Sequence, residues 1–344
     1  MKYPLRSALL LLAVMVMMIT KGLGQDIKTG ISVHDPVMIK QDSVYHLFCT
    51  GQGIAHWSSI DMVHWRAEKP VFDKPPAWAI EAVPSFKGHI WAPDISFYNG
   101  LYYLYYSVSA FGKNTSCIGV ATNKTLNTSN VEYQWVDHGK VIQSIPGQTN
   151  WNAIDPNLAI DKKGAAYLAF GSFWAGLKMV KLTKDRLSLA QNTDNLPTIA
   201  TRVRIKQGNN PAAIDDNPKD AGGNAIEAPF IFKKGKYFYL FASADYCCKG
   251  PKSTYKMIVG RSKKLAGPYL DKSGERMDKG GGTLLLEGDQ NWYGVGHNAV
   301  CTFDGADYLV YHGYDAADKG RSKLLISKIT WLNGWPEAKI PIVN

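Results

Sequence analysis

Short apolar runs built around aromatic residues recur five times along the chain, and a polar residue lies about nine to twelve positions ahead of each run. Each run has the length and the content of Tyr, Phe, Val and Leu that favour a buried β-strand. The five runs are Val44–Phe48, Tyr102–Tyr106, Ala166–Phe170, Phe238–Phe241 and Asp307–Tyr311. The polar residues ahead of them are Asp35, Asp94, Asp155, Glu227 and His297. A repeat of roughly 58 to 72 residues made of short strands predicts a radial array of sheets, a β-propeller.

Prolines place the four acidic residues at strand entrances. The sequence reads Asp35-Pro36, Pro93-Asp94, Asp155-Pro156 and Glu227-Ala228-Pro229. Proline cannot donate to a sheet ladder, so it belongs among the first residues of a strand. Matching positions of a propeller point toward one axis, and we therefore expect these carboxylates to meet near one rim of the array.

The N-terminus has the pattern of an export signal. A basic start with Lys2 and Arg6 precedes an apolar run over residues 8–19, and small residues follow at Gly22 and Gly24. The apolar run is too short to span a bilayer comfortably, and no later stretch is long enough. We expect residues 1–24 to be removed and the protein to be secreted or periplasmic. Residues 26–344 are then expected to form a single all-β domain, with a further strand between residues 331 and 344.

Composition and charge narrow the function classes. The hydrophobic content of 45% supports a full core, and the formal net charge is +10. The basic residues are scattered and form no stripe, which argues against a nucleic-acid partner. The five cysteines match no zinc pattern, and the adjacent Cys247 and Cys248 form either a vicinal disulfide or two thiols.

Carboxyl groups gathered near one axis can perform acid and base catalysis. Like charges and burial raise some of their pKa values, while hydrogen bonds and cations keep other groups ionised. Cleavage of a glycosidic bond needs such a pair, an acid for the leaving oxygen and a base for water. Glu227 has the longer side chain and suits the acid, whereas Asp35 and Asp155 could activate water and orient Glu227. His297 could bind a cation, become a charged partner, or be a structural histidine.

Aromatic and amide side chains near the acids are candidate sugar contacts. Flat rings stack on the apolar faces of sugars, and Trp91 lies three residues before the predicted rim acid Asp94. Phe111 and Phe173 follow the second and third repeats, and Asn152 could reach a sugar hydroxyl or form a turn.

Six motifs, in this order and spacing, resemble glycoside hydrolase family 43 and most closely its endo-1,5-α-L-arabinanase branch. They are Val33-His34-Asp35-Pro36, Trp91-Ala92-Pro93-Asp94, Ile154-Asp155-Pro156-Asn157, Gly171-Ser172-Phe173-Trp174, Ala225-Ile226-Glu227-Ala228-Pro229 and Gly296-His297-Asn298. The resemblance covers nearly the whole chain after the signal, and it implies a five-bladed β-propeller.

The same resemblance implies roles for individual residues. Asp35 would be the general base, Glu227 the general acid and Asp155 the residue that tunes Glu227, in hydrolysis with inversion. Inversion predicts a separation of roughly 6.5 to 9.5 Å between base and acid. His297 would contact a calcium ion or a water cluster in the central channel. Ser172 and Phe173 are implied subsite residues, and Asp94 is interpreted as structural or close to substrate.

The leading hypothesis is a secreted, monomeric hydrolase that cleaves internal α-1,5 bonds of arabinan, the polymer of pectic side chains. An exo-acting α-L-arabinofuranosidase or β-xylosidase on the same fold is the alternative enzyme. A propeller that binds carbohydrate without cleaving it is a third possibility, since fold alone does not establish catalysis.

Overall fold

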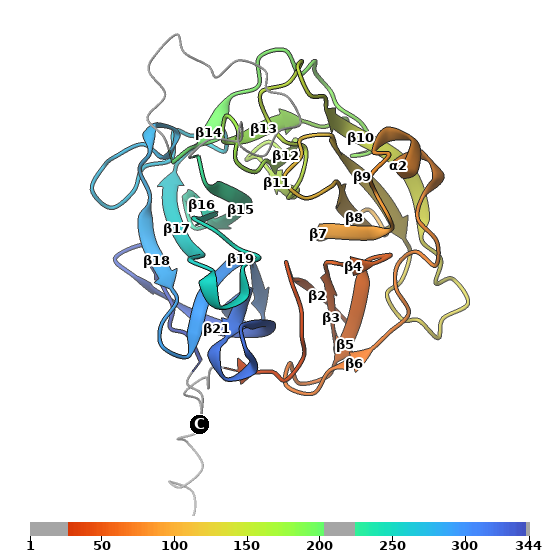
Figure 1. Cartoon of the computed structure of the whole chain (residues 1–344), viewed down its shortest axis with the longest axis horizontal. Coiled ribbons are helices and arrows are strands. Elements are labelled where there is room, and N and C mark those ends of the chain that lie inside the picture. Colours follow the sequence, from red (N-terminus) through yellow and green to blue (C-terminus); the bar gives the residue numbers. More distant parts are fainter. Residues whose placement is uncertain (1–26, 203–223, 342–344) are drawn as a thin grey trace, which may run out of the picture.

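The computed structural model describes residues 27–202 and 224–341. Its strands form five antiparallel sheets set radially around a common centre (Figure 1), which confirms the five-bladed β-propeller. The described residues contain one α-helix, α2 (Ala77–Ala82). None of the helices found there has the length and apolar content needed to cross a membrane. The predicted export signal, residues 1–24, lies outside the described residues.

The first two blades take up residues up to Ser144. Blade one pairs its strands in the order β2 (Val37–Gln41), β3 (Val44–Cys49), β5 (Ala55–Ser59) and β6 (Arg66–Ala67). Blade two consists of β7 (His89–Tyr98), β8 (Leu101–Val108), β9 (Ser116–Asn123) and β10 (Val136–Ser144), and the short β4 (Gly51–Gln52) pairs with β7.

The other three blades repeat this order. Blade three is β11 (Asn157–Ile160), β12 (Ala166–Phe170), β13 (Leu177–Lys181) and β14 (Thr198–Ala200). Blade four is β15 (Ile226–Lys234), β16 (Tyr237–Ala244), β17 (Lys256–Ser262) and β18 (Thr283–Glu287). Blade five contains β19 (Trp292–Phe303), β20 (Ala306–Asp315), β21 (Arg321–Leu332) and β22 (Trp335–Glu337). The first strand of each blade lies nearest to the centre (Figure 1).

The aromatic runs of the sequence are the second strands of the blades, β3, β8, β12, β16 and β20. Each second strand pairs with a neighbour on both edges. Adjacent blades cover its faces, so seven of the eight residues of β8 are buried. A strand covered on both faces is apolar almost without interruption, which is why these runs are the strongest signal in the sequence.

The fifth blade is completed by both ends of the described chain. β1 (Ile27–Lys28) pairs with β21 through Ile27 opposite Ile326 and Lys28 opposite Leu325. Thr29 adds a hydrogen bond from its Oγ1 to the Leu324 carbonyl at 3.2 Å. β22 also pairs with β21, which confirms the predicted C-terminal strand. Sharing one blade between the two ends closes the ring and covers the edge of β21.

The repeated position at the blade entrances differs from the predicted one. At each blade entrance one residue has a left-handed backbone, and these five are Asp35 (φ 54°), Ala92 (φ 42°), Asp155 (φ 57°), Ala228 (φ 54°) and His297 (φ 50°). In blades two, four and five this residue lies in a β-bulge of the innermost strand. A proline follows directly in four blades, and Asn298 follows in blade five.

Two of the five predicted equivalences are therefore wrong. Asp94 lies two residues after the repeated position, and Glu227 lies one residue before it. The repeated position is an alanine in blades two and four, so a nearby acid gave the polar signal in its place. The proline that follows the bulge marks the register more reliably, since it fixes the start of the ladder.

Candidate active site

A cleft of about 800 Å³ opens at the centre of one face, and all five blades line it. Asp35, Asp155 and Glu227 contribute to its wall, so the structure brings the three predicted acids together. The other predicted site residues line the same cleft, and they are Trp91, Phe111, Asn152, Ser172, Phe173 and His297.

Asp35 is buried among histidines. Its Oδ1 lies 2.7 Å from Nδ1 of His34 and 3.0 Å from Nδ1 of His297, and its Oδ2 accepts a hydrogen bond from Thr50 at 2.5 Å. Burial by itself would raise the pKa of Asp35, but the His297 and His34 rings hold it well below its usual value. Asp35 is thus maintained as a carboxylate.

Glu227 is held by two hydroxyl groups. The Tyr255 hydroxyl donates to Oε1 and the Ser172 hydroxyl donates to Oε2, each at 2.7 Å. Both donors are buried, so solvent does not compete strongly for these hydrogen bonds. The arrangement fixes the plane of the Glu227 carboxyl at the cleft wall.

Asp155 connects the two sides of the site. Its Oδ2 accepts the backbone N–H of Ala228 at 3.1 Å, one residue after Glu227. Burial raises the pKa of Asp155 well above its usual value, the His297 ring opposes this, and the charges of Glu227 and Asp35 add to it. The pKa of Asp155 therefore depends on the charges of both neighbouring acids, Glu227 and Asp35.

His297 faces the three acids from blade five. Burial would lower its pKa, but the charge and hydrogen bond of Asp35, with the charges of Asp155 and Glu227, raise it to about 9. The ring therefore favours its charged form beside Asp35. His312 behaves in the opposite way, because burial beside His34 lowers its pKa well below the usual value.

The central channel continues below the cleft as a cavity of about 10 Å³. Its lining includes Asp94, Asp155, His297 and Asn298. Asp94 accepts hydrogen bonds from the backbone of Leu158 at 2.7 Å and from the Asn157 side chain at 3.2 Å. Burial raises the pKa of Asp94 to about 7, and these donors act against that rise. Asp94 thus links blades two and three on the channel side, which agrees with the structural reading of this residue.

The predicted sugar contacts differ in exposure. Phe111 is 77% exposed at the cleft margin, whereas Ser172 is only 4% exposed and holds Glu227. Trp91 donates from Nε1 to His89 at 3.1 Å, and the ring of Phe173 lies 5.9 Å from that of Tyr246. Asn152 is buried and donates to the Lys113 carbonyl at 3.3 Å. Rings at several depths of the cleft can contact a chain of sugar units.

Sequence reasoning missed several residues that organise the site. His34 and Tyr255 contact catalytic candidates directly. A further set, of which only Ser172 was predicted, shares one position at the end of each second strand, and its members are Thr50, Ser107, Ser172, Ser243 and His312. In four blades this side chain accepts the backbone N–H of the left-handed residue in the next blade. Ser172 instead donates to Glu227. The polar residue that recurs at this position was a signal in the sequence for these contacts.

The channel partly fits a hydrated cation. Both polar side-chain atoms of Asn298 are buried without a hydrogen-bond partner among the described residues. The cavity has room for about one water-sized particle. His297 uses Nδ1 for Asp35, which leaves its Nε2 to contact a water. Among the residues that the structure describes, the close groups of possible ligands are His34 with Cys247 and Cys248, and His34 with Asp35 and His312. His297 belongs to neither group.

The fold and the site define the chain as a β-propeller glycoside hydrolase, with carboxyl groups from separate blades gathered in one sugar-sized cleft. The family model described as Glycosyl hydrolases family 43 matches residues 29–336, and the chain belongs to this family.

Close relatives act on arabinan according to their names. The extracellular exo-α-(1→5)-L-arabinofuranosidase ArbA of Cellvibrio japonicus (strain Ueda107) is 50% identical over 308 residues, covering 89% of this chain and 86% of the relative. The extracellular endo-α-(1→5)-L-arabinanase 1 of Bacillus subtilis (strain 168) is 43% identical over 308 residues, covering 88% of this chain and 87% of the relative. A solved structure of a Cellvibrio cellulosa α-L-arabinanase complexed with arabinohexaose matches with a TM-score of 0.84 and 48% identity, covering 90% of this chain and 96% of that chain. The chain is thus a family 43 hydrolase of the arabinanase and arabinofuranosidase type.

Proposed function

We propose that this protein is a secreted hydrolase that cleaves internal α-1,5-L-arabinofuranosidic bonds of arabinan with inversion. The observation that carries the proposal is the contrast between two carboxyl groups in one cleft. Asp35 is surrounded by histidines that keep it ionised, and Glu227 is held by two hydroxyl donors. Different environments for two carboxyls are what acid and base roles require.

The proton transfers follow from these environments. The Asp35 carboxylate accepts a proton from a water molecule as that water attacks the anomeric carbon. Glu227 donates its proton to the leaving oxygen, and Ser172 and Tyr255 keep the carboxyl directed into the cleft. Asp155 has the tuning role for Glu227, because its Oδ2 accepts the N–H of Ala228, the next residue along the chain. Single displacement requires room for a water molecule between the two carboxyl groups, so this mechanism predicts a separation of roughly 6.5 to 9.5 Å between Asp35 and Glu227.

Arabinan is the proposed substrate because relatives of high identity are named for it. The cleft of about 800 Å³ extends from the acids to exposed rings such as Phe111, which suits a polymer better than a single sugar. The direct test is purified protein on linear arabinan, arabinoxylan and aryl glycosides. Release of oligosaccharides from linear arabinan alone supports the proposal, and no release from it would sink the proposal.

Exo action is the second candidate, and a specific observation favours it. The relative that is 50% identical is named as exo-acting, while the one that is 43% identical is named as endo-acting. The two modes differ in whether one end of the cleft is blocked. Early loss of viscosity with mixed oligomers indicates endo action. Release of one short product from the beginning, with viscosity retained, indicates exo action.

We also propose that a hydrated cation, with calcium as the leading choice, occupies the central channel beside His297 and Asn298. The unpartnered side-chain atoms of Asn298 and the Nε2 atom of His297 would contact its water shell. Calcium takes six to eight oxygen ligands, so water must supply most of them. The ion would supply positive charge beneath the acids. Removal by a chelator should lower the melting temperature, calcium should restore it, and elemental analysis should find about one ion per chain.

The proposed function includes export of the protein with removal of residues 1–24. Two relatives are named extracellular, and residues 1–24 have the pattern of a signal peptide. N-terminal sequencing of the protein from culture medium or periplasm should begin close to residue 25. An uncleaved N-terminus in the cytosol would contradict this expectation.

A further inference from the structure

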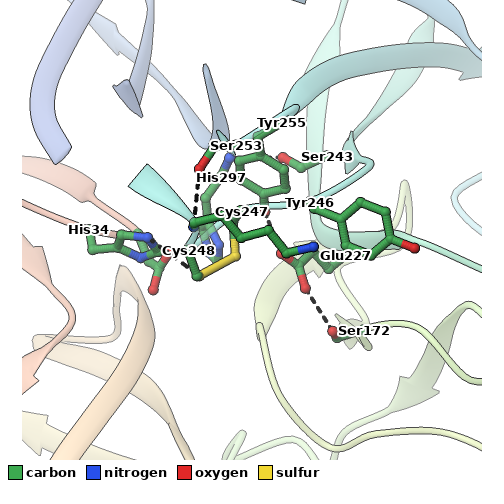
Figure 2. Close-up of a disulfide and its surroundings, with 12 residues drawn as sticks. His34, Ser172, Glu227, Ser243, Tyr246, Cys247, Cys248, Ser253, Tyr255 and His297 are labelled. Carbon is green, nitrogen blue, oxygen red and sulfur yellow. Dashed lines mark hydrogen bonds and ion pairs between the residues drawn. A yellow bond between two sulfur atoms is a disulfide. The ribbon is translucent and has the colours of Figure 1, made fainter. Parts of the chain in front are cut away.

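The adjacent cysteines Cys247 and Cys248 form a disulfide that belongs to the cleft wall. They lie in the loop between β16 and β17, and both line the cavity that contains Asp35 and Glu227. Figure 2 draws the disulfide with His34 on one side and Glu227 on the other. The Sγ atom of Cys248 is 3.8 Å from Nε2 of His34. A covalent group at this position is next to the acids that cleave the bond.

The loop is fixed to the neighbouring blade through the disulfide-bonded residues. The backbone N–H of Cys248 donates to the Tyr314 hydroxyl of blade five at 2.7 Å. That hydroxyl is 2.8 Å from Nε2 of His34, whose Nδ1 contacts Asp35 at 2.7 Å. A chain of contacts therefore connects the loop to Asp35 and gives it a defined position across blade five.

The loop presents the disulfide next to an aromatic ring, Tyr246, and Nζ of Lys249 lies 4.0 Å from the centroid of that ring. Cys247 is half-buried, Cys248 is exposed, and Tyr246 beside them is 41% exposed. The Phe173 ring lies 5.9 Å from the Tyr246 ring. The sulfur atoms of a disulfide are polarisable and need no strong hydrogen bond, so they can pack against the C–H face of a furanose ring. A bond between neighbouring residues also fixes the loop before binding, which lowers the ordering cost.

We propose that the Cys247–Cys248 disulfide is a specificity-determining contact for the sugar chain in the catalytic cleft. It holds the arabinofuranose unit next to the scissile bond, between His34 on one side and Glu227 on the other, together with Tyr246 and Phe173. This inference rests on the proposed function and adds a substrate contact to it. The disulfide has no chemical step in the reaction.

Binding and turnover separate this role from a purely structural one. Arabinohexaose affinity is measured by calorimetry on the Glu227→Gln protein, oxidised and after reduction with a phosphine, in buffer supplied with calcium. We expect reduction to weaken binding about tenfold, the low end of the range for a lost apolar contact. In the active enzyme KM for linear arabinan should rise similarly while kcat stays nearly constant, because ground-state and transition-state contacts are lost equally.

Variants keep the test decisive if reduction is incomplete. Cys247→Ser with Cys248→Ser should reproduce the reduced enzyme and should not respond to phosphine. The double alanine variant should retain more affinity than the double serine variant, since the lost contact is apolar. Cys301→Ser, which changes a thiol of blade five outside the cleft lining, is the matched control and should retain wild-type affinity. Circular dichroism and melting temperature show whether each variant is folded.

The outcomes distinguish the two proposals. Unchanged arabinohexaose affinity in the reduced and double serine proteins, with arabinan still cleaved, overturns the disulfide contact alone. A fall in kcat at unchanged KM also overturns it, because the disulfide would then act by positioning His34 and Asp35. If the oxidised wild-type protein neither binds arabinohexaose nor cleaves linear arabinan, the proposed function has failed, and the contact fails with it.

Discussion

At the scale of single residues, Glu227 is the side chain on which turnover should depend most. Glu227→Gln keeps the size of the side chain and its position near Ser172 and Tyr255 but cannot donate the acidic proton. We expect kcat on linear arabinan to fall by about 10²- to 10⁴-fold, the usual contribution of a general acid. Aryl arabinosides with good leaving groups should lose much less, because they need little protonation. An equal loss on both substrates would contradict the assignment.

The two hydroxyl donors to Glu227 make a second residue-scale prediction. Tyr255→Phe removes the donor to Oε1, and Ser172→Ala removes the donor to Oε2. Each change should lower kcat about tenfold with KM nearly unchanged, and the pH profile of kcat should shift, because the acid loses a fixed partner. Tyr311→Phe is the matched control, since this buried hydroxyl pairs with Ser327 in blade five. A similar loss in the control would show that buried hydroxyls matter only for packing.

The sequence predicted the acids but not their immediate partners. Asp35, Asp155 and Glu227 were recognisable because motifs and prolines surround them. Ser172 was expected on the sugar, and the structure places it, buried, on Glu227. Tyr255 was not predicted, because it directly precedes β17, the third strand of its blade, and its hydroxyl meets Glu227 only through the packing of the blade. Contacts of that kind depend on the arrangement of blades, which no local pattern encodes.

At the scale of elements, the first blade contains a buried histidine pair that should limit stability in acid. His46 of β3 and His56 of β5 meet through their ring nitrogens at 3.0 Å, and His56 stacks on Phe48. Burial lowers the pKa of His46 to about 4, against the pull of the Glu68 charge. Burial, and then the neighbouring His46, lower the pKa of His56 to about 3.

The direction of the pH effect follows from these values. Between about pH 6.5 and pH 4 the unfolded chain binds protons at both rings that the folded chain does not bind, so falling pH favours unfolding. The free energy of unfolding should therefore drop across this window. His56→Gln should make the drop shallower by on the order of 2 kcal/mol, as measured by urea unfolding at several pH values.

A surface histidine provides the comparison for this prediction. His64 has a side chain that is 87% exposed and pairs with Asp61 at the surface, so His64→Gln should change the slope of stability between pH 6.5 and pH 4 much less than His56→Gln does. If His56→Gln and His64→Gln give the same slope as the wild-type protein, the buried pair is not the cause of acid sensitivity.

At the scale of the whole molecule, the shared fifth blade should determine how firmly the ring is closed. A chain that begins at Ser32 lacks β1, the Thr29 hydrogen bond to Leu324, and the hydrogen bond that the Leu324 N–H donates to Ile31. We expect a loss of roughly 2 to 4 kcal/mol, from a few hydrogen bonds and an uncovered strand edge. Thermal unfolding measures the loss, and a chain that begins at Ile27 is the control. Equal melting temperatures would show that β1 does not contribute to closure.

The whole-molecule prediction succeeded because five buried second strands give the same signal five times. Each of these strands is covered on two faces and paired on two edges, so its composition is strongly constrained. The register of the inner strands was harder to predict. The repeated position is an alanine in blades two and four, so the polar signal came from Asp94 and Glu227 close to it. Repetition therefore predicts architecture well, and it predicts which residues face the axis less well.

The left-handed position that recurs around the axis has a consequence for how such a site can change. Three blades supply a titratable side chain there, while Ala92 and Ala228 supply only a methyl group. The backbone already accepts a non-glycine residue at both alanines. One codon change at either place would introduce a new functional group at the centre without altering any loop or strand. A protein with this symmetry can diversify its chemistry by point substitution, while its framework stays the same.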